Sequence, residues 1–213
     1  MNKGLKRLKG VVVSRPFIYG NVAVELNPPK QDHTHEWTVF VKSCDGSDLS
    51  HIIPKVEIKL HETFVSSNRV LTSLPYEVTE TGWGEFEVII KLFFPPCSGE
   101  NPISLYHMLK LYPPEGQASN WPKHKQVNNV YFDELIFSEP TEEFFEILMA
   151  NKSPGLPATI GVDHPFSLEL ELKEAKILDE AIEKTKAQYK EYELQLAAMK
   201  KEILSLKSEG FYF

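Results

Sequence analysis

The sequence predicts an all-β domain followed by a long α-helix, and three patterns lead to this prediction. From residue 11 to about residue 111, short apolar or alternating runs are separated by turn residues, which is typical of antiparallel strands. Val56, Ile58 and Leu60 face one side of such a run, and the charged residues between them face the other. Beyond residue 166 the turn residues give way to a heptad spacing. We therefore expect a β-sandwich of two sheets with a C-terminal α-helical coiled coil.

The strands expected in the β-domain are short and follow one another along the chain. They cover residues 11–13, 21–26, 37–42, 56–60, 76–79, 86–94, 103–111 and 130–137. Clusters of turn-forming residues separate them, and each cluster favours a turn over a continued strand: Pro28-Pro29, Asp45-Gly46-Ser47, Pro95-Pro96 and Pro113-Pro114.

Composition shifts divide the chain into four expected segments. Residues 1–10 form a basic N-terminal arm, which could touch DNA or act in nuclear import, or could be a frayed and solvated terminus. Residues 11–140 form the sandwich. Residues 141–166 contain a short helix at 142–151 and a Pro-rich linker. Residues 167–209 form the coiled-coil helix.

The signals for this last helix are a cap, a terminator and a seam. Ser167 can cap the N-terminus, the first turn is acidic, and Gly210 can end the helix. The seam predicts a partner helix, either in a second copy or in another protein, and the alternative is an amphipathic helix folded back on the sandwich. Its positions alternate in steps of four and three residues: Leu178, Ile182, Thr185, Tyr189, Tyr192, Leu196, Met199, Ile203 and Leu206.

Charge and composition exclude several functions. A net charge of −7 argues against general nucleic-acid binding and suits a basic partner better. No run is long and apolar enough to span a membrane, and the first residues lack the apolar stretch of a secretory signal, so we expect an intracellular protein with no membrane partner. Two cysteines, Cys44 and Cys97, have no metal or disulfide spacing, and we expect both to be reduced and structural.

Two aromatic loops form the candidate binding site. Trp83 lies between Gly82 and Gly84 just before a strand, and glycine lets a backbone or a ligand approach closely. Phe64 follows a strand end that also carries a histidine and a hydroxyl. If the loops meet, their rings form a slot that suits a flat, uncharged amide such as acylated lysine. A buried core tryptophan is the alternative interpretation of Trp83.

Several segments strongly resemble a YEATS domain, and the resemblance covers residues 11–140. The closest subgroup is the glioma-amplified-sequence type, which also carries a C-terminal coiled coil and is a subunit of nucleosome acetyltransferase and Swr-type remodelling complexes. The segments that carry the resemblance are Ile18-Tyr19-Gly20-Asn21-Val22-Ala23, His33-Thr34-His35-Glu36-Trp37-Thr38-Val39-Phe40-Val41, Leu60-His61-Glu62-Thr63-Phe64, Thr81-Gly82-Trp83-Gly84-Glu85-Phe86, Ser104-Leu105-Tyr106-His107 and Tyr131-Phe132-Asp133-Glu134.

The resemblance implies an immunoglobulin-like fold in a nuclear protein that reads acetyl-lysine and crotonyl-lysine on histone H3 tails. It implies that Phe64 and Trp83 stack on the acyl group and that the Thr63 hydroxyl contacts the acyl amide. Thr63 and Phe64 stand where the subgroup usually has serine and tyrosine, which bears on the acyl chain preferred. The remaining pocket residues implied are His61 in the lining, Gly82 and Gly84 around the Trp83 backbone donor, and Phe86 and His35 near the channel.

An enzymatic role is not expected. The seven histidines and two cysteines have no catalytic motif around them, and the pair His33 and His35 has no third metal ligand in the sequence. We expect no cofactor and no metal. The remaining alternative is a structural scaffold subunit of a chromatin complex, which would have no open slot and would not bind acyl-lysine.

Overall fold

The computed structural model describes residues 6–30, 32–114, 116, 121–122, 125–151, 155–159 and 164–208. The chain divides into two compact units. The first unit, residues 1–157 and 161–166, contains the β-domain, and the second, residues 158–160 and 167–213, contains the long helix α2 (Leu168–Ser208). No helix in the described ranges is long and apolar enough to cross a membrane.

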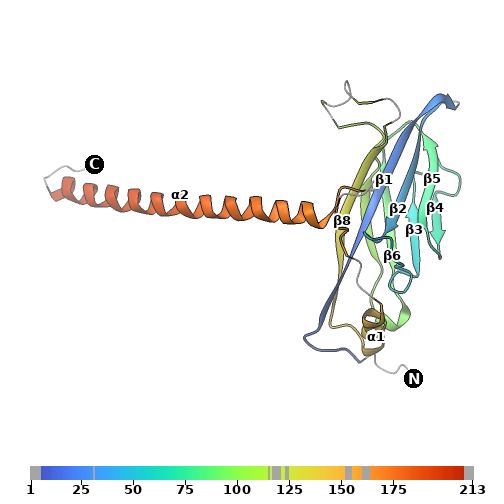
Figure 1. The fold of residues 1–213 in the computed structure, drawn as a ribbon, viewed down its shortest axis with the longest axis horizontal. Helices are drawn as coiled ribbons and strands as arrows, with labels where there is room; N and C mark the ends of the chain where they lie inside the picture. Colours follow the sequence, from blue (N-terminus) through green and yellow to red (C-terminus); the bar gives the residue numbers. More distant parts are fainter. Residues whose placement is uncertain are drawn as a thin grey trace. The chain divides into compact units, whose positions relative to one another are not determined.

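The β-domain consists of two antiparallel sheets of four strands each (Figure 1). The strand order is β5-β2-β1-β8 in the first sheet and β4-β3-β6-β7 in the second. The predicted sandwich of two sheets is confirmed. The strands are β1 (Val12–Lys30), β2 (His33–Lys42), β3 (Lys55–Lys59), β4 (Asn68–Leu71), β5 (Tyr76–Gly82), β6 (Glu87–Phe93), β7 (Ile103–Met108) and β8 (Val127–Ser138).

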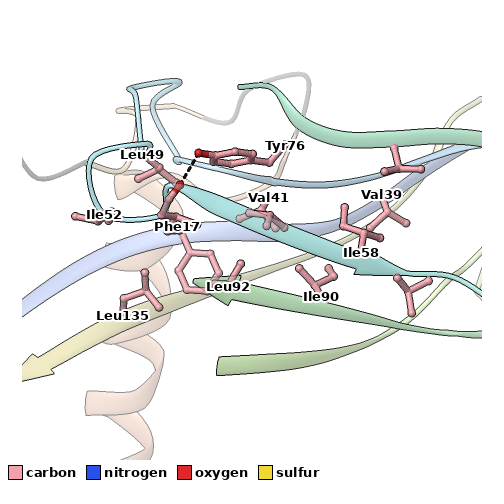
Figure 2. Close-up of a cluster of buried hydrophobic side chains, with 14 of the residues drawn as sticks. Phe17, Val39, Val41, Leu49, Ile52, Ile58, Tyr76, Ile90, Leu92 and Leu135 are labelled. Carbon is pink, nitrogen blue, oxygen red and sulfur yellow. Dashed lines mark hydrogen bonds between the residues drawn. The ribbon is translucent and has the colours of Figure 1, made fainter. Parts of the chain in front are cut away.

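The core lies between the inner faces of the two sheets (Figure 2). Val56 and Ile58 are fully buried, Leu60 is nearly so, and the residues between them face outward, so the predicted alternation is confirmed. Tyr76 is buried at one end of the core, where its hydroxyl donates a hydrogen bond to the Ile53 carbonyl. Buried hydroxyls normally find such a partner, because an unpaired polar group in the core is costly.

Two strand predictions were wrong. The expected strands 11–13 and 21–26 are parts of the single strand β1, which also contains Pro28 and Pro29. A register shift against β2 between Glu25 and Lys30 accommodates these prolines, so the pair does not act as a turn. The second miss is β4, a four-residue edge strand that begins with polar residues and has no apolar run to signal it.

A buried polar network connects β1 with β7 and with the residues that follow β7. The amide oxygen of Asn21 accepts a hydrogen bond from the backbone N–H of Lys110 at 3.0 Å, and the Asn21 amide group donates to the Lys110 carbonyl at 2.8 Å. His107 Nε2 lies 2.9 Å from the same amide oxygen. Because that oxygen carries no proton, Nε2 is the donor and the neutral ring leaves Nδ1 unprotonated. The network fixes the chain segment that follows β7.

Helix α1 (Glu142–Ala150) follows β8, close to the predicted range 142–151. The Thr141 hydroxyl accepts from the Phe144 backbone N–H at 3.2 Å and caps the N-terminus. At the other end, the buried guanidinium of Arg15 donates to the Leu148 carbonyl. A cation at a helix C-terminus stabilises the helix dipole, so both ends of α1 are held by the β-domain.

The basic N-terminal arm is held against the β-domain as far as the structure describes it. Arg7 forms an ion pair with Glu100 at 2.8 Å, and Lys6 forms one with Glu142 at 2.5 Å. The Lys6 carbonyl also accepts the Glu142 backbone N–H at 3.0 Å. These residues are therefore not frayed, and their charges are engaged within the chain. Lys3 lies outside the described residues.

The Pro-rich stretch predicted as a linker packs on the outer face of the first sheet where it is described. Leu156 and Phe166 cover a small cluster that includes the buried side chains of Ile18 and Phe40. The ring of His164 is buried and stacks on Phe166 with a centroid distance of 5.8 Å. This stretch therefore contributes apolar burial to the β-domain in addition to connecting it to α2.

Cys44 and Cys97 are free thiols. Burial raises the pKa of the Cys44 thiol to about 11 and also raises that of Cys97. Since the thiolate is the reactive form, these shifts disfavour reaction at neutral pH. That both cysteines are reduced and structural stays a prediction.

The predicted long helix is confirmed as α2, and none of its described side chains is buried. The Ser167 hydroxyl accepts the Leu170 backbone N–H at 3.2 Å, which confirms the predicted cap. Gly210, the predicted terminator, lies outside the described residues. The apolar side chains of the seam, such as Leu196 and Ile203, are exposed on α2.

Candidate functional site

A hollow of about 580 Å³ opens at one end of the sandwich. Three chain segments line it: the start of β2, the turn between β3 and β4 together with Arg69 of β4, and the end of β5 with the turn to β6. The structure thus brings together seven of the eight predicted site residues and leaves out His35. The lining residues are His33, His61, Thr63, Phe64, Val65, Arg69, Glu80, Thr81, Gly82, Trp83, Gly84, Glu85 and Phe86.

The turn after β3 positions the hydroxyl of Thr63. The Phe64 backbone N–H donates to the His61 carbonyl at 3.1 Å and closes the turn. His61 Nδ1 lies 3.4 Å from the Thr63 backbone N–H and 3.0 Å from the Thr63 Oγ1. Since the backbone N–H can only donate, Nδ1 is the acceptor and the Thr63 hydroxyl directs its own proton at the ring. The lone pairs of Oγ1 therefore remain available to accept a hydrogen bond from a ligand.

Phe64 is held in an aromatic cluster that forms the inner wall of the hollow. Its ring centroid lies 5.5 Å from Phe86 and 5.6 Å from Trp37, and the ring of His61 lies 6.0 Å from Phe86. Trp37 is only 1% exposed, so it anchors the cluster in the core. Edge-to-face and tilted packing at these distances is favourable and leaves little freedom for the Phe64 ring.

Trp83 forms the outer wall, and its side chain is 67% exposed. It makes none of the ring contacts found among the described residues. A buried core tryptophan, the alternative interpretation, is therefore wrong for this residue. Trp83 and Phe64 line the same hollow, and a slot for a flat group requires two such rings.

The two glycines beside Trp83 keep space open rather than permit an unusual backbone. A Cβ at Gly84 would meet nothing within 4 Å. A Cβ at Gly82 would lie 3.4 Å from Trp37 Nε1 and 3.9 Å from Phe64 Cζ, which is ordinary contact. Neither residue has the left-handed backbone that only glycine adopts easily. The missing side chains therefore leave room at the floor and rim of the hollow.

The rim contains polar residues that the sequence analysis did not assign to the site. Arg69 forms an ion pair with Glu80 at 2.6 Å and donates to the carbonyls of Ser66 at 2.7 Å and Val65 at 2.9 Å. It thereby ties the Phe64 turn to β5. His33, which we considered only as a metal ligand, contributes a ring to the rim. Arg69 was missed because β4, the strand that carries it, has no sequence signal.

His35 does not line this hollow, although it was predicted near the channel. It lines a smaller hollow of about 260 Å³, and its ring contacts Tyr112 edge-on at 4.8 Å. Burial lowers the pKa of His35, against the opposing effect of Glu25 and Glu85. His35 therefore lies beside the hollow, as the cross-strand partner of Gly82, with its ring against Tyr112.

No cluster of three or more His, Cys, Asp or Glu side chains that could hold a metal ion occurs among the described residues. The pair His33 and His35 does not form one. Instead, His33 Nδ1 lies 2.6 Å from the Thr81 hydroxyl, and His35 Nδ1 lies 2.8 Å from the Thr34 hydroxyl. Both imidazoles are engaged in hydrogen bonds within the sheet.

Comparisons with known proteins agree with this geometry. The family model described as YEATS family matches residues 32–113, which include the whole hollow. Two structures of the Yaf9 YEATS domain are similar over 68% of this chain. One, bound to histone H3 acetylated at lysine 27, has 43% identity, a TM-score of 0.61 and 99% of its length covered. The other recognises a histone H3 peptide succinylated at lysine 122 and has 44% identity, a TM-score of 0.58 and 98% coverage. The predicted immunoglobulin-like sandwich is confirmed.

A relative from Kluyveromyces lactis, called Protein AF-9 homolog, extends the similarity beyond the sandwich. It is 41% identical over 207 residues, which cover 90% of this chain and 93% of the relative. The match therefore includes much of α2. The resemblance drawn from the sequence motifs is confirmed, and the chain belongs to the YEATS family.

Proposed function

We propose that the hollow between Phe64 and Trp83 reads acylated lysine on histone H3 tails. The observation that carries this proposal is that the rings of Phe64 and Trp83 and the residue Thr63 line one open hollow. Acetylated and succinylated histone H3 peptides are bound by Yaf9 YEATS domains more than 40% identical to this chain, which supports the same ligand class.

The chemistry of the hollow favours a neutral amide over an ammonium ion. The planar acyl amide stacks between the rings of Phe64 and Trp83. Its N–H donates to the free lone pairs of Thr63 Oγ1, and its carbonyl accepts a backbone N–H of the Trp83 turn. An unmodified lysine would have to bury a charge there without a carboxylate of its own, because the Glu80 carboxylate is paired with Arg69 and the Glu85 carboxylate with Lys110. Acylation therefore switches binding on.

The expected acyl groups include acetyl and crotonyl, and the volume of about 580 Å³ accommodates chains longer than acetyl. His61, Gly82, Gly84 and Phe86 complete the site in this proposal. Phe64 lacks the tyrosine hydroxyl that the subgroup usually carries there, so acyl selectivity rests on shape and stacking at this position.

Replacing Trp83 with alanine is expected to abolish the preference for acylated peptide. Removing one stacking wall should weaken binding of an acetylated or crotonylated histone H3 peptide by about tenfold or more and leave the unmodified peptide unaffected. The measurement is calorimetric titration of the full chain with both peptides. Tyr106→Ala is the matched control, because Tyr106 is an aromatic residue of equal exposure, 66%, on β7 outside the hollow.

The scaffold alternative predicts the opposite outcome. If the chain is only a scaffold, acylated and unmodified peptides bind equally to the unsubstituted chain, and Trp83→Ala changes the affinity for neither peptide. A Trp83→Ala protein that keeps its thermal midpoint and still discriminates the peptides would show that the site lies elsewhere.

We further propose that α2 docks the chain into a larger chromatin assembly, such as an acetyltransferase or remodelling complex in the nucleus. A row of exposed apolar side chains at heptad spacing needs a partner helix to bury it. The side rows of this seam carry both charge signs, with Lys186, Glu193 and Lys200 on one side, so they do not repel a second copy. In the purified chain, where no other subunit is present, a second copy is therefore the partner that we expect on the seam.

Light scattering tests this proposal on the full chain. We expect a mass of twice 24.4 kDa, and a return to the monomer mass for Leu196→Asp, which puts a charge in the seam. Leu194→Asp is the matched control: Leu194 is two residues away, points outward from the seam and is 73% exposed. A monomer mass for the unsubstituted chain would assign the seam to a helix of another protein.

A further inference from the structure

We propose that Tyr112 and Glu85 are positioning residues that hold the Trp83 turn (residues 83–86) in the conformation that binds an acyl group. The inference rests on the proposed function and names the residues that make the slot rigid. Neither residue was singled out by the sequence analysis. Tyr112 is separated from Trp83 by 29 positions and lies after β7, so only the fold brings them together.

The Trp83 turn needs support from outside, because its own side chain supplies none. The indole is 67% exposed, and no other described ring contacts it. The turn connects β5 to β6, contains Gly84 and directly follows Gly82, and the glycine backbone is the most flexible of all residues. An unsupported turn would lose conformational entropy on binding a ligand, at the expense of affinity.

Tyr112 holds the backbone of this turn from the far side. Its hydroxyl donates to the Trp83 carbonyl at 3.2 Å. Its ring lies edge-on against His35, with an interplanar angle of 77°, and His35 is buried. The contact with His35 therefore supports the Tyr112 ring, which is 50% exposed, and His35 contributes to the site by orienting Tyr112.

Glu85 fastens the other end of the turn to the same segment. Its carboxylate accepts the backbone N–H groups of Leu111 at 2.9 Å and Tyr112 at 3.3 Å, and the ammonium group of Lys110 at 2.7 Å. Burial raises the pKa of Glu85, but these hydrogen bonds outweigh burial and the pKa is lowered. The carboxylate therefore remains charged and bonded at neutral pH.

The segment to which Glu85 is bonded, residues 110–112, is itself bonded to buried side chains. Asn21 bonds both the N–H and the carbonyl of Lys110, and buried His107 bonds Asn21. A continuous set of hydrogen bonds thus runs from the core, through Lys110 and Glu85, to the turn.

Fixing the Trp83 carbonyl also fixes a hydrogen-bond donor. In a trans peptide group the carbonyl and the following N–H lie in one plane and point in opposite directions. When Tyr112 holds the Trp83 carbonyl, the N–H of Gly84 is directed away from Tyr112. Gly84 lines the hollow, and its missing side chain leaves that face open. The hydroxyl of Tyr112 therefore orients the Gly84 N–H, next to the Trp83 N–H that the resemblance gives as the donor to the acyl carbonyl, without touching the ligand.

The substitution Tyr112→Phe tests this role, because it removes the hydroxyl and keeps the ring on His35. We expect binding of an acetylated histone H3 peptide to weaken by about three- to tenfold, with the unmodified peptide and the thermal midpoint unchanged. In the Trp83→Ala protein the same substitution should have no further effect. Tyr106→Phe is the matched control, since it removes an exposed hydroxyl from β7 outside the hollow.

Fluorine NMR of the chain labelled with 5-fluorotryptophan supplies a reading that needs no ligand. Tyr112→Phe should shift or broaden the Trp83 resonance and leave that of buried Trp37 in place. An unchanged Trp83 resonance, or acyl affinity equal to that of the unsubstituted chain, would overturn the positioning role. If the unsubstituted chain does not prefer acylated peptide, the proposed function fails, and the resonance still decides whether Tyr112 holds the turn.

Discussion

Replacing Gly20 with alanine is expected to destabilise the β-domain by about 3 kcal/mol or more. Gly20 lies in β1 with φ of +155°, directly opposite β8. A Cβ there would lie 2.2 Å from the Asn129 carbonyl oxygen and 2.7 Å from the Val130 Cα. Both are backbone atoms of the neighbouring strand, so no side-chain rotation relieves the clash. The strands would have to separate beside Asn21, which holds the segment after β7.

Urea unfolding followed by circular dichroism measures this effect on the full chain. Gly84→Ala is the matched control, because a Cβ there meets nothing within 4 Å, and we expect its unfolding free energy to stay within about 1 kcal/mol of the unsubstituted chain. A Gly20→Ala protein with an unchanged urea midpoint would show that β1 and β8 are less closely apposed than the structure describes.

Lowering the pH from 6.5 to 4 is expected to remove up to about 3 kcal/mol of stability through His107 alone. Burial lowers the pKa of His107 to about 4, below the value of an exposed histidine. Protonation would place a proton on Nδ1, which has no hydrogen-bond partner in the described structure, in a ring that packs against Tyr19 and Tyr131. The unfolded chain therefore binds the proton first, so the stability present above pH 6.5 is lost as the pH falls toward 4.

The variant His107→Gln isolates this contribution, because its amide nitrogen can replace Nε2 as the donor to Asn21 and does not titrate. His35 and His51 have pKa values lowered in the same direction and remain in both proteins. We expect the variant to be less stable at pH 7 but to lose less stability between pH 6.5 and 4.5. If both proteins lost the same free energy of unfolding between pH 6.5 and 4.5, His107 would be excluded as the source of the pH dependence.

The parts of the fold that follow from local periodicity were predictable from the sequence. The alternation of Val56, Ile58 and Leu60 and the capped heptad helix that begins after Ser167 depend on neighbouring residues only. The continuity of β1 through Pro28 and Pro29 was not predictable, since it depends on a register shift against β2. Turn propensity describes isolated dipeptides and does not include a neighbouring strand.

The candidate site was likewise predictable only where it depends on local sequence. Trp83 and Phe64 stood out as aromatic residues on loops, and the family motifs placed them in one pocket. Arg69 and Tyr112 were missed, because their roles depend on contacts with Glu80 and Trp83 across the fold. His35 was predicted near the channel, but its edge-on packing against Tyr112 makes it a support rather than a wall.

The packing of Leu156 and Phe166 on the first sheet has a consequence for where this protein can be shortened. A chain that stops after β8 would expose Ile18 and Phe40, both buried in the intact protein, as part of an apolar patch with Val22, Val130 and Phe132. Such patches promote aggregation. The shortest β-domain that keeps this patch covered therefore ends near Phe166. The boundary between the two units of the chain lies between Phe166 and Leu168.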